Sequence, residues 1–117
     1  MYTVIYLYRV NRKHAQEFID IKKQAGEICL SHGALEDNTY LPENLHGNYG
    51  CKGLVDVIQK EENEEIFLGQ SVFRNKSHHD DVIKQVDENP EFNKLFNEIT
   101  SMINLSKVIS ATFSTDN

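Results

Sequence analysis

The chain has 117 residues, the size of one domain with a single hydrophobic core, and we treat residues 1–117 as that domain. Acidic residues outnumber basic ones by 18 to 12, the formal net charge is -6, and no basic run is longer than a pair. Clustered lysine and arginine supply most of the affinity for nucleic acids and anionic lipids, so we expect no nucleic-acid partner and no membrane partner.

Residues 1–8 lack the basic start and the small-residue cleavage site of a secretory signal, and no apolar run approaches the length of a membrane span. These features predict a cytoplasmic protein. Its two cysteines, Cys29 and Cys51, are then expected to be reduced rather than joined in a disulfide.

The first elements are the clearest. Residues 2–10 are β-branched or aromatic at nearly every position and predict a strand. Asn11 is a suitable N-cap, apolar residues then recur at helical spacing, and Gly33 offers a left-handed stop, which predicts a helix over about residues 12–32.

The middle of the chain predicts mostly strands. Residues 34–41 indicate a weaker strand, and the glycine-rich residues 43–53 indicate a mobile loop. Residues 54–59 and 66–73 are both strand-like, so the simplest interpretation is an antiparallel hairpin with a charged tip at residues 60–65.

The last third predicts a broken helix and a strand. Ser77 and Asp80 have the spacing of a capping box, and the helix that they start is interrupted at Asn89 and Pro90. Pro90 suits the first turn of a second helical segment. Residues 107–115 then alternate as a final strand.

This order of elements predicts an α+β fold, a ferredoxin-like antiparallel sheet with two helices on one face and either one extra strand or an elongated hairpin. Either side of residues 2–10, tyrosine-rich or aliphatic, is too apolar to face water comfortably, and the sequence leaves open which side meets the helices. We therefore expect a homodimer that stacks two sheets face to face as a dimeric α+β barrel.

Several short motifs fall in the order and near the spacing of a known family. They are Gly33-Ala34-Leu35, Glu61-Glu62-Asn63-Glu64-Glu65, Asn75-Lys76 and Asn89-Pro90-Glu91-Phe92. On these residues the chain resembles the YbaA-like bacterial proteins of unknown function, in the dimeric α+β barrel superfamily. The chain departs from the family pattern at Gln70, where the family has tryptophan, and at residues 104–107. The resemblance implies a ferredoxin-like fold and dimerisation, and it supplies no catalytic residues.

Two clusters of potential metal ligands do not have the geometry or the number of ligands that a metal site needs. His78-His79-Asp80-Asp81 are adjacent on a helix, where neighbours point about 100° apart, so they are better explained as first-turn residues. His46 and Cys51 supply two ligands where a structural metal site needs about four. We expect no metal site and no cofactor.

Candidate ligand-pocket residues are His32, Tyr40 and Gln70, in a pocket between sheet and helices that residues 43–53 would cover. Tyr2, Tyr6 and Tyr8 suit the dimer interface better than a ligand cavity, because tyrosine is enriched in interfaces. Two functions remain open: a small-molecule-binding or catalytic dimer of unknown reaction and unknown catalytic residues, and a non-enzymatic interaction or stress-associated protein that acts through its dimer surface.

Overall fold

Two long strands, β1 (Tyr2–Asn11) and β3 (Glu64–Phe73), form the centre of the sheet in the computed structural model, which describes residues 1–115. β2 (Glu36–Tyr40) pairs with β3, and β4 (Ile109–Ser114) pairs with β1. The order is β2-β3-β1-β4 and every pairing is antiparallel. This arrangement confirms the predicted ferredoxin-like α+β fold.

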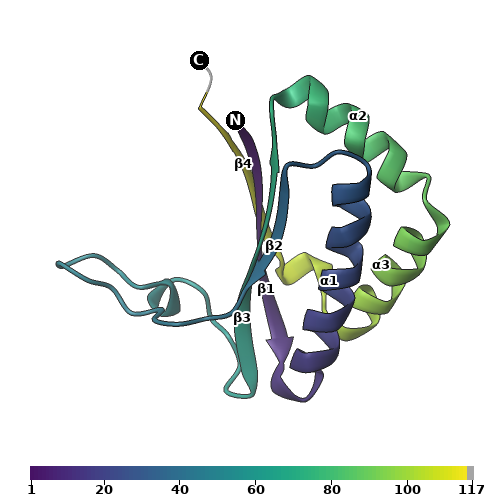
Figure 1. Cartoon of the computed structure of the whole chain (residues 1–117). Helices are drawn as coiled ribbons and strands as arrows, with labels where there is room; N and C mark the ends of the chain where they lie inside the picture. Colours follow the sequence, from purple (N-terminus) through teal and green to yellow (C-terminus); the bar gives the residue numbers. More distant parts are fainter. Residues whose placement is uncertain (116–117) are drawn as a thin grey trace.

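Three helices cover one face of this sheet (Figure 1). They are α1 (Ala15–Ser31), α2 (Lys76–Asp87) and α3 (Pro90–Met102). Short 3₁₀ turns at Arg12–His14, Leu54–Asp56 and Leu105–Lys107 complete the regular structure. None of the helices within residues 1–115 is both long enough and apolar enough to cross a bilayer.

Local signals place the helix ends. The Asn11 side chain accepts a hydrogen bond from the Lys13 backbone N–H, and Gly33 follows α1 with φ of +111°, as expected for a left-handed stop. Asn89 caps α3 by accepting from the Phe92 N–H at 2.9 Å, with Pro90 in the first turn. The prediction for α2 was wrong in one detail: Asn75, rather than Ser77, is its N-cap.

The register decides which side of β1 meets the helices. Val4, Tyr8 and Val10 are buried beneath them, so the tyrosine-rich side faces the helical layer. Tyr8 packs with Phe18 of α1, and Phe73 packs with α2 residues, in two adjoining core clusters. The assignment of all three tyrosines to a sheet-to-sheet interface was therefore wrong.

The predicted hairpin of residues 54–59 and 66–73 was also wrong. β3 pairs instead with β2 and β1, and residues 54–56 form a 3₁₀ turn. Residues 41–63, here called the arm, connect β2 to β3. They project from the sheet on the side away from the helices, as Figure 1 shows. The arm therefore does not cover the space between sheet and helices, contrary to the prediction for residues 43–53.

The sheet face opposite the helices, here called the open face, carries an apolar strip. Cross-strand partners lie on the same face, so Ile5 with Ala111, Leu7 with Ile109 and Thr3 with Phe113 share it. Ile109 is 49% exposed and Phe113 62% exposed. No helix covers this strip in the described part of the chain.

Candidate functional site

A cavity of about 180 Å³ lies in the layer between the sheet and the helices. One end, here called the polar end, is lined by Tyr6, Tyr8, Lys22, Asp37 and Ser71 together with Gly26 and the Cys29 thiol. The other, the apolar end, is lined by Ile83, Phe92, Phe96, Ile99, Leu105 and Val108. A hollow with mostly apolar walls and a few convergent polar groups is the usual form of a ligand site.

Lys22 brings a positive charge to the polar end from α1. It lies one helical turn after Phe18, on the side of α1 that faces the sheet. Its ammonium nitrogen donates to the Tyr8 hydroxyl at 3.3 Å and lies 5.2 Å from the centre of the Tyr8 ring. The phenol of β1 therefore stabilises the ammonium through both its oxygen and its π face.

Asp37 brings a carboxylate from β2. The Ser71 hydroxyl of β3 donates to one carboxylate oxygen of Asp37 at 2.7 Å, across the antiparallel pair that joins the two residues. Gly26 of α1 makes this approach possible, because a methyl group there would lie 2.6 Å from the other Asp37 oxygen. The side chain of Asp37 is thus fixed against α1.

The surroundings fix the charge states at this end. Burial by itself opposes the charge of Lys22, but Tyr8 and Asp37 together outweigh it and the pKa of Lys22 is raised. Burial, reinforced by the charge of Asp37, raises the pKa of Cys29 to about 12, so the thiol stays protonated. Burial also raises the pKa of Tyr6. The polar end therefore holds the Lys22 ammonium, a neutral Tyr6 phenol and a neutral Cys29 thiol.

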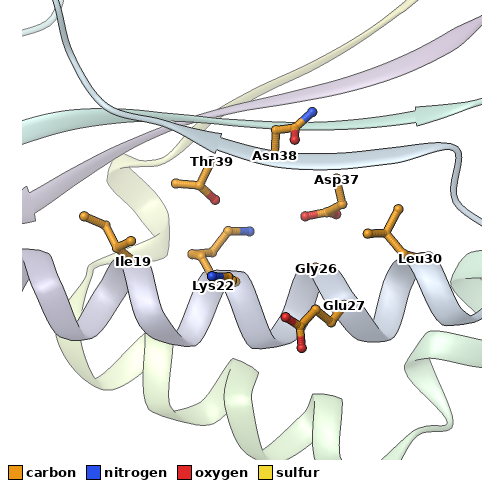
Figure 2. A pocket seen from close by; sticks show the side chains of 9 residues that line it. Ile19, Lys22, Gly26, Glu27, Leu30, Asp37, Asn38 and Thr39 are labelled. Atoms are coloured by element: carbon orange, nitrogen blue, oxygen red, sulfur yellow. The ribbon is translucent and has the colours of Figure 1, made fainter.

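A groove of about 370 Å³ between α1 and β2 adjoins the cavity and shares Lys22, Gly26 and Asp37 with it. Figure 2 shows Lys22 extending from α1 toward β2, and the Asp37 carboxylate pointing from β2 toward the helix near Gly26. These three residues form the boundary between the outer groove and the inner cavity.

The residues predicted from sequence lie elsewhere. The Tyr40 hydroxyl donates to the Gln70 side-chain oxygen at 3.3 Å, but both residues belong to the open face. His32 lies at the end of α1, where its ring contacts Gln85 at 3.2 Å and Asn89 at 3.4 Å. The structure thus brings Tyr40 and Gln70 together, leaves His32 apart from them, and places none of the three in the cavity.

The histidine cluster of α2 is occupied by structural contacts. His78 accepts a hydrogen bond from the Arg74 backbone N–H at 2.9 Å, and His79 contacts Asp80 at 2.9 Å. The His79 ring also packs edge-on against Phe73 at 4.8 Å. Within residues 1–115, no three His, Cys, Asp or Glu side chains are grouped so that they could share a metal ion.

Sequence reasoning missed Lys22, Asp37 and Ser71. It favoured the dimer interface over the ligand cavity for Tyr8, which lines the cavity. One signal was available for Lys22: a lysine one turn after Phe18 interrupts the apolar stripe of α1. Asp37 and Ser71 carried no comparable signal, because their meeting depends on the register of β2 against β3.

The family model described as "Protein of unknown function (DUF1428)" matches residues 1–102. The chain belongs to this family. All the polar-end residues lie within the matched region. No curated protein matches the chain.

Solved structures share the fold at low sequence identity. An uncharacterised NIPSNAP domain protein from Burkholderia xenovorans is 14% identical, with a TM-score of 0.59 over 99% of this chain and 95% of that one. A conserved protein from Methanosarcina mazei is 16% identical, with a TM-score of 0.64 over 98% and 92%. A putative antibiotic biosynthesis monooxygenase from Nitrosomonas europaea is 7% identical, with a TM-score of 0.65 over the whole of both chains. At these identities the likeness concerns the fold alone.

Proposed function

We propose that this protein binds a compact small molecule in the cavity between sheet and helices, and that it does so as a homodimer. The observation that carries the proposal is the polar end itself: Lys22, Asp37 and Tyr8 converge on a hollow whose remaining walls are apolar. Lys22 and Asp37 are partly buried. Removing an ammonium and a carboxylate from water costs stability unless they are well satisfied, and such groups are frequent at functional sites.

The cavity limits the ligand in size and chemistry. Its volume of about 180 Å³ is below the range of roughly 300–1,000 Å³ that is usual for ligand pockets. The ligand is therefore small, with an apolar body against Phe92 and Ile99 and an oxygen function at Lys22 and Tyr8. The groove between α1 and β2 is its route of entry.

Thermal-shift measurements with benzoate, phenol and 2-tetralone test binding, since these probes put a carboxylate, a hydroxyl and a ketone on a compact apolar body. A ligand at a hundred times its Kd stabilises the native state by about 2.7 kcal/mol, enough to raise Tm by several degrees. We expect at least one probe to do so in the wild type and in Lys84→Met, an exposed control on α2. Lys22→Met should lose the shift. No shift with any probe would contradict the proposal.

The open face supports the homodimer. Its strip of Ile5, Leu7, Ile109 and Phe113 has no charged residue among these members, and it is continuous across β1 and β4. An apolar surface of this kind on a sheet favours association, and a second copy brings an identical, self-complementary strip. The resemblance to YbaA-like proteins carries the same expectation.

The exposed arm favours one alternative, in which the protein acts through its surface alone. Leu41, Tyr49 and Val57 of the arm are 61%, 104% and 66% exposed, which suits contact with a protein partner. This alternative predicts that Lys22→Met has no functional consequence. We also propose a cytoplasmic location, and the free thiols of Cys29 and Cys51 support it because cysteines stay reduced in that compartment.

A further inference from the structure

The polar end holds two opposite charges that do not neutralise each other directly. Lys22 donates a hydrogen bond to the Tyr8 hydroxyl, and Asp37 accepts one from the Ser71 hydroxyl. Between these two side chains, both in the described part of the chain, there is no ion pair. A carboxylate and an ammonium held on facing elements, each by its own partner, can act on two different atoms of one ligand.

Tyr8 and Lys22 both have hydrogen-bond donors left for an oxygen atom of a ligand. Tyr8 accepts its hydrogen bond from Lys22, so its own hydroxyl proton can be donated to another acceptor. Lys22 has three donor protons, and the bond to Tyr8 uses one. An oxygen atom of a ligand placed near both groups would receive two donors, one of them charged. Developing negative charge on that oxygen would be stabilised there.

Asp37 is positioned as the matching proton acceptor. Its carboxylate extends from β2 into the layer between sheet and helices. It accepts a hydrogen bond from the Ser71 hydroxyl at 2.7 Å, and it fits against Gly26 because that residue has no side chain. It lines the same cavity as Lys22 and Tyr8. A general base must reach the proton that it removes, and the position of Asp37 in the cavity wall brings its carboxylate next to a ligand in that cavity.

We infer that this site catalyses proton exchange at the carbon next to a carbonyl group, with compact apolar ketones as the substrate class. Asp37 removes the proton from that carbon, the C–H electron pair forms the C=C bond of an enolate, and the C=O π pair moves to oxygen. Tyr8 and Lys22 stabilise the oxyanion. Asp37 then returns a proton to the same carbon or, in a conjugated substrate, to another one, which regenerates the carboxylate.

The step is balanced without any further reactant, because the proton taken up by Asp37 is the one that it gives back or exchanges with water. The ketone body fits the apolar end, where Phe92, Ile99 and Val108 offer contact without hydrogen bonds. The inference rests on the proposed function, since it uses the same cavity. It adds the reaction and the role of Asp37.

Deuterium exchange of 2-tetralone in D₂O, followed by proton NMR, tests the inference. We expect the wild type to accelerate loss of the proton signals beside the carbonyl, and Asp37→Asn to lower that acceleration by about 100-fold or more. Asp20→Asn makes the same chemical change at an exposed position of α1 and should leave the rate unchanged. Lys22→Met should reduce it by about 100-fold or more.

Binding is measured separately from exchange. The shifts of the methyl signals of the cavity residues Ile83, Ile99 and Val108 report binding of 2-tetralone. Binding to both wild type and Asp37→Asn, with exchange in the wild type alone, would support the inference. Binding without exchange above the Asp37→Asn rate would overturn it and leave the proposed function intact. Failure of 2-tetralone to bind would also overturn it, while benzoate and phenol still test the binding site.

A second variant tests the role of Asp37 if circular dichroism shows that Asp37→Asn does not fold. Ser71→Ala removes only the hydrogen bond that holds Asp37. Ser71 is a positioning residue, so its loss should lower the exchange rate at saturating 2-tetralone several-fold while the Kd stays unchanged. An unchanged exchange rate in a folded Ser71→Ala variant, together with an unchanged rate in Lys22→Met, would overturn the inference.

Discussion

Gly26 of α1 lets Asp37 of the polar end pack closely against the helix, because it has no side chain. Glycine inside a helix is less favourable than alanine by about 1 kcal/mol, and α1 contains it at a buried position. The Asp37 carboxylate occupies the space that a methyl group would take. The glycine therefore lowers the stability of the helix but leaves room for the Asp37 carboxylate.

Gly26→Ala should accordingly fail to stabilise the protein. In the wild type the new methyl group would displace Asp37 and cancel the gain of about 1 kcal/mol in helix propensity. In an Asp37→Ala background the same change should raise the free energy of unfolding. Urea denaturation of the two single variants and the double variant measures this coupling. Equal stabilisation in both backgrounds would show that Asp37 does not occupy this space.

The ionisation of one side chain, Glu64, affects the stability of the protein in acid. Burial opposes its charge, but the Glu61 backbone N–H and Arg9 outweigh burial and lower the pKa of Glu64 below its ordinary value of 4.5. Both partners of the Arg9–Glu64 ion pair are partly buried, with side chains 15% and 16% exposed, and their closest atoms lie 3.0 Å apart. A carboxylate whose pKa is lower in the folded state stabilises the protein above its unfolded pKa.

Glu64→Gln should therefore lower the free energy of unfolding by about 1 kcal/mol at pH 7. The difference from the wild type should shrink as the pH falls through the pKa of folded Glu64, where the wild-type side chain becomes protonated. Denaturation series at pH 7, 5 and 3 check this. Glu62→Gln, at an exposed position near the end of the arm, is the matched control. A constant difference at all pH values would refute the explanation.

At the scale of elements, local chemistry accounts for the features that sequence predicted well. Asn11, Gly33 and Asn89 act at helix ends through hydrogen bonds or backbone geometry within a few residues. Residues 54–59 misled the prediction because their apolar pattern suits a strand, yet only Ile58 is buried among the apolar members. The true partner of β3, residues 36–40, is polar and has weak strand propensity.

The cavity was predictable only in outline, for the same reason. Its location between sheet and helices follows from the fold class. The sequence also offered the cavity lining as the second interpretation of the tyrosines of β1. Asp37 and Ser71 meet only because β2 pairs with β3 in one register. A slip by one residue would turn Asp37 to the open face, so no local pattern could identify it.

Asn89→Ala tests the cap that separates α2 from α3. Loss of the side-chain bond to the Phe92 N–H should lower the free energy of unfolding by about 1 kcal/mol. Asn97→Ala, an exposed position within α3, should instead be neutral or slightly stabilising because alanine favours helices. Urea denaturation of both variants measures the contrast. Similar effects of the two substitutions would mean that the cap contributes little.

At the scale of the molecule, one side of the sheet is covered by helices and the other is not. Figure 1 shows the resulting asymmetry, with helices on one side of the sheet and the arm on the other. A second copy on the open face would cover Ile109 and Phe113. The two helical layers would then lie outermost, and each cavity would stay within one subunit.

Phe113→Glu should shift the protein toward monomer. It places a charge in the proposed interface, and burying that charge without a partner would be strongly unfavourable. Sedimentation velocity at micromolar concentration measures the change in mass. Ser110→Glu adds the same charge to β4 on the opposite face and should leave the dimer intact. A monomeric wild type would remove the homodimer proposal.

The arm also affects how the chain folds. It separates β2 from β3, which form neighbouring strands, by residues 41–63 instead of by a tight turn. Closing a loop about ten times longer than a two-residue hairpin turn costs about 2 kcal/mol more in chain entropy. Pairing β1 with β3 closes a still longer loop, residues 12–63, which costs more by the same rule. β2 should therefore pair with β3 first, and the contact between Asp37 and Ser71 should form before β1 completes the centre of the sheet.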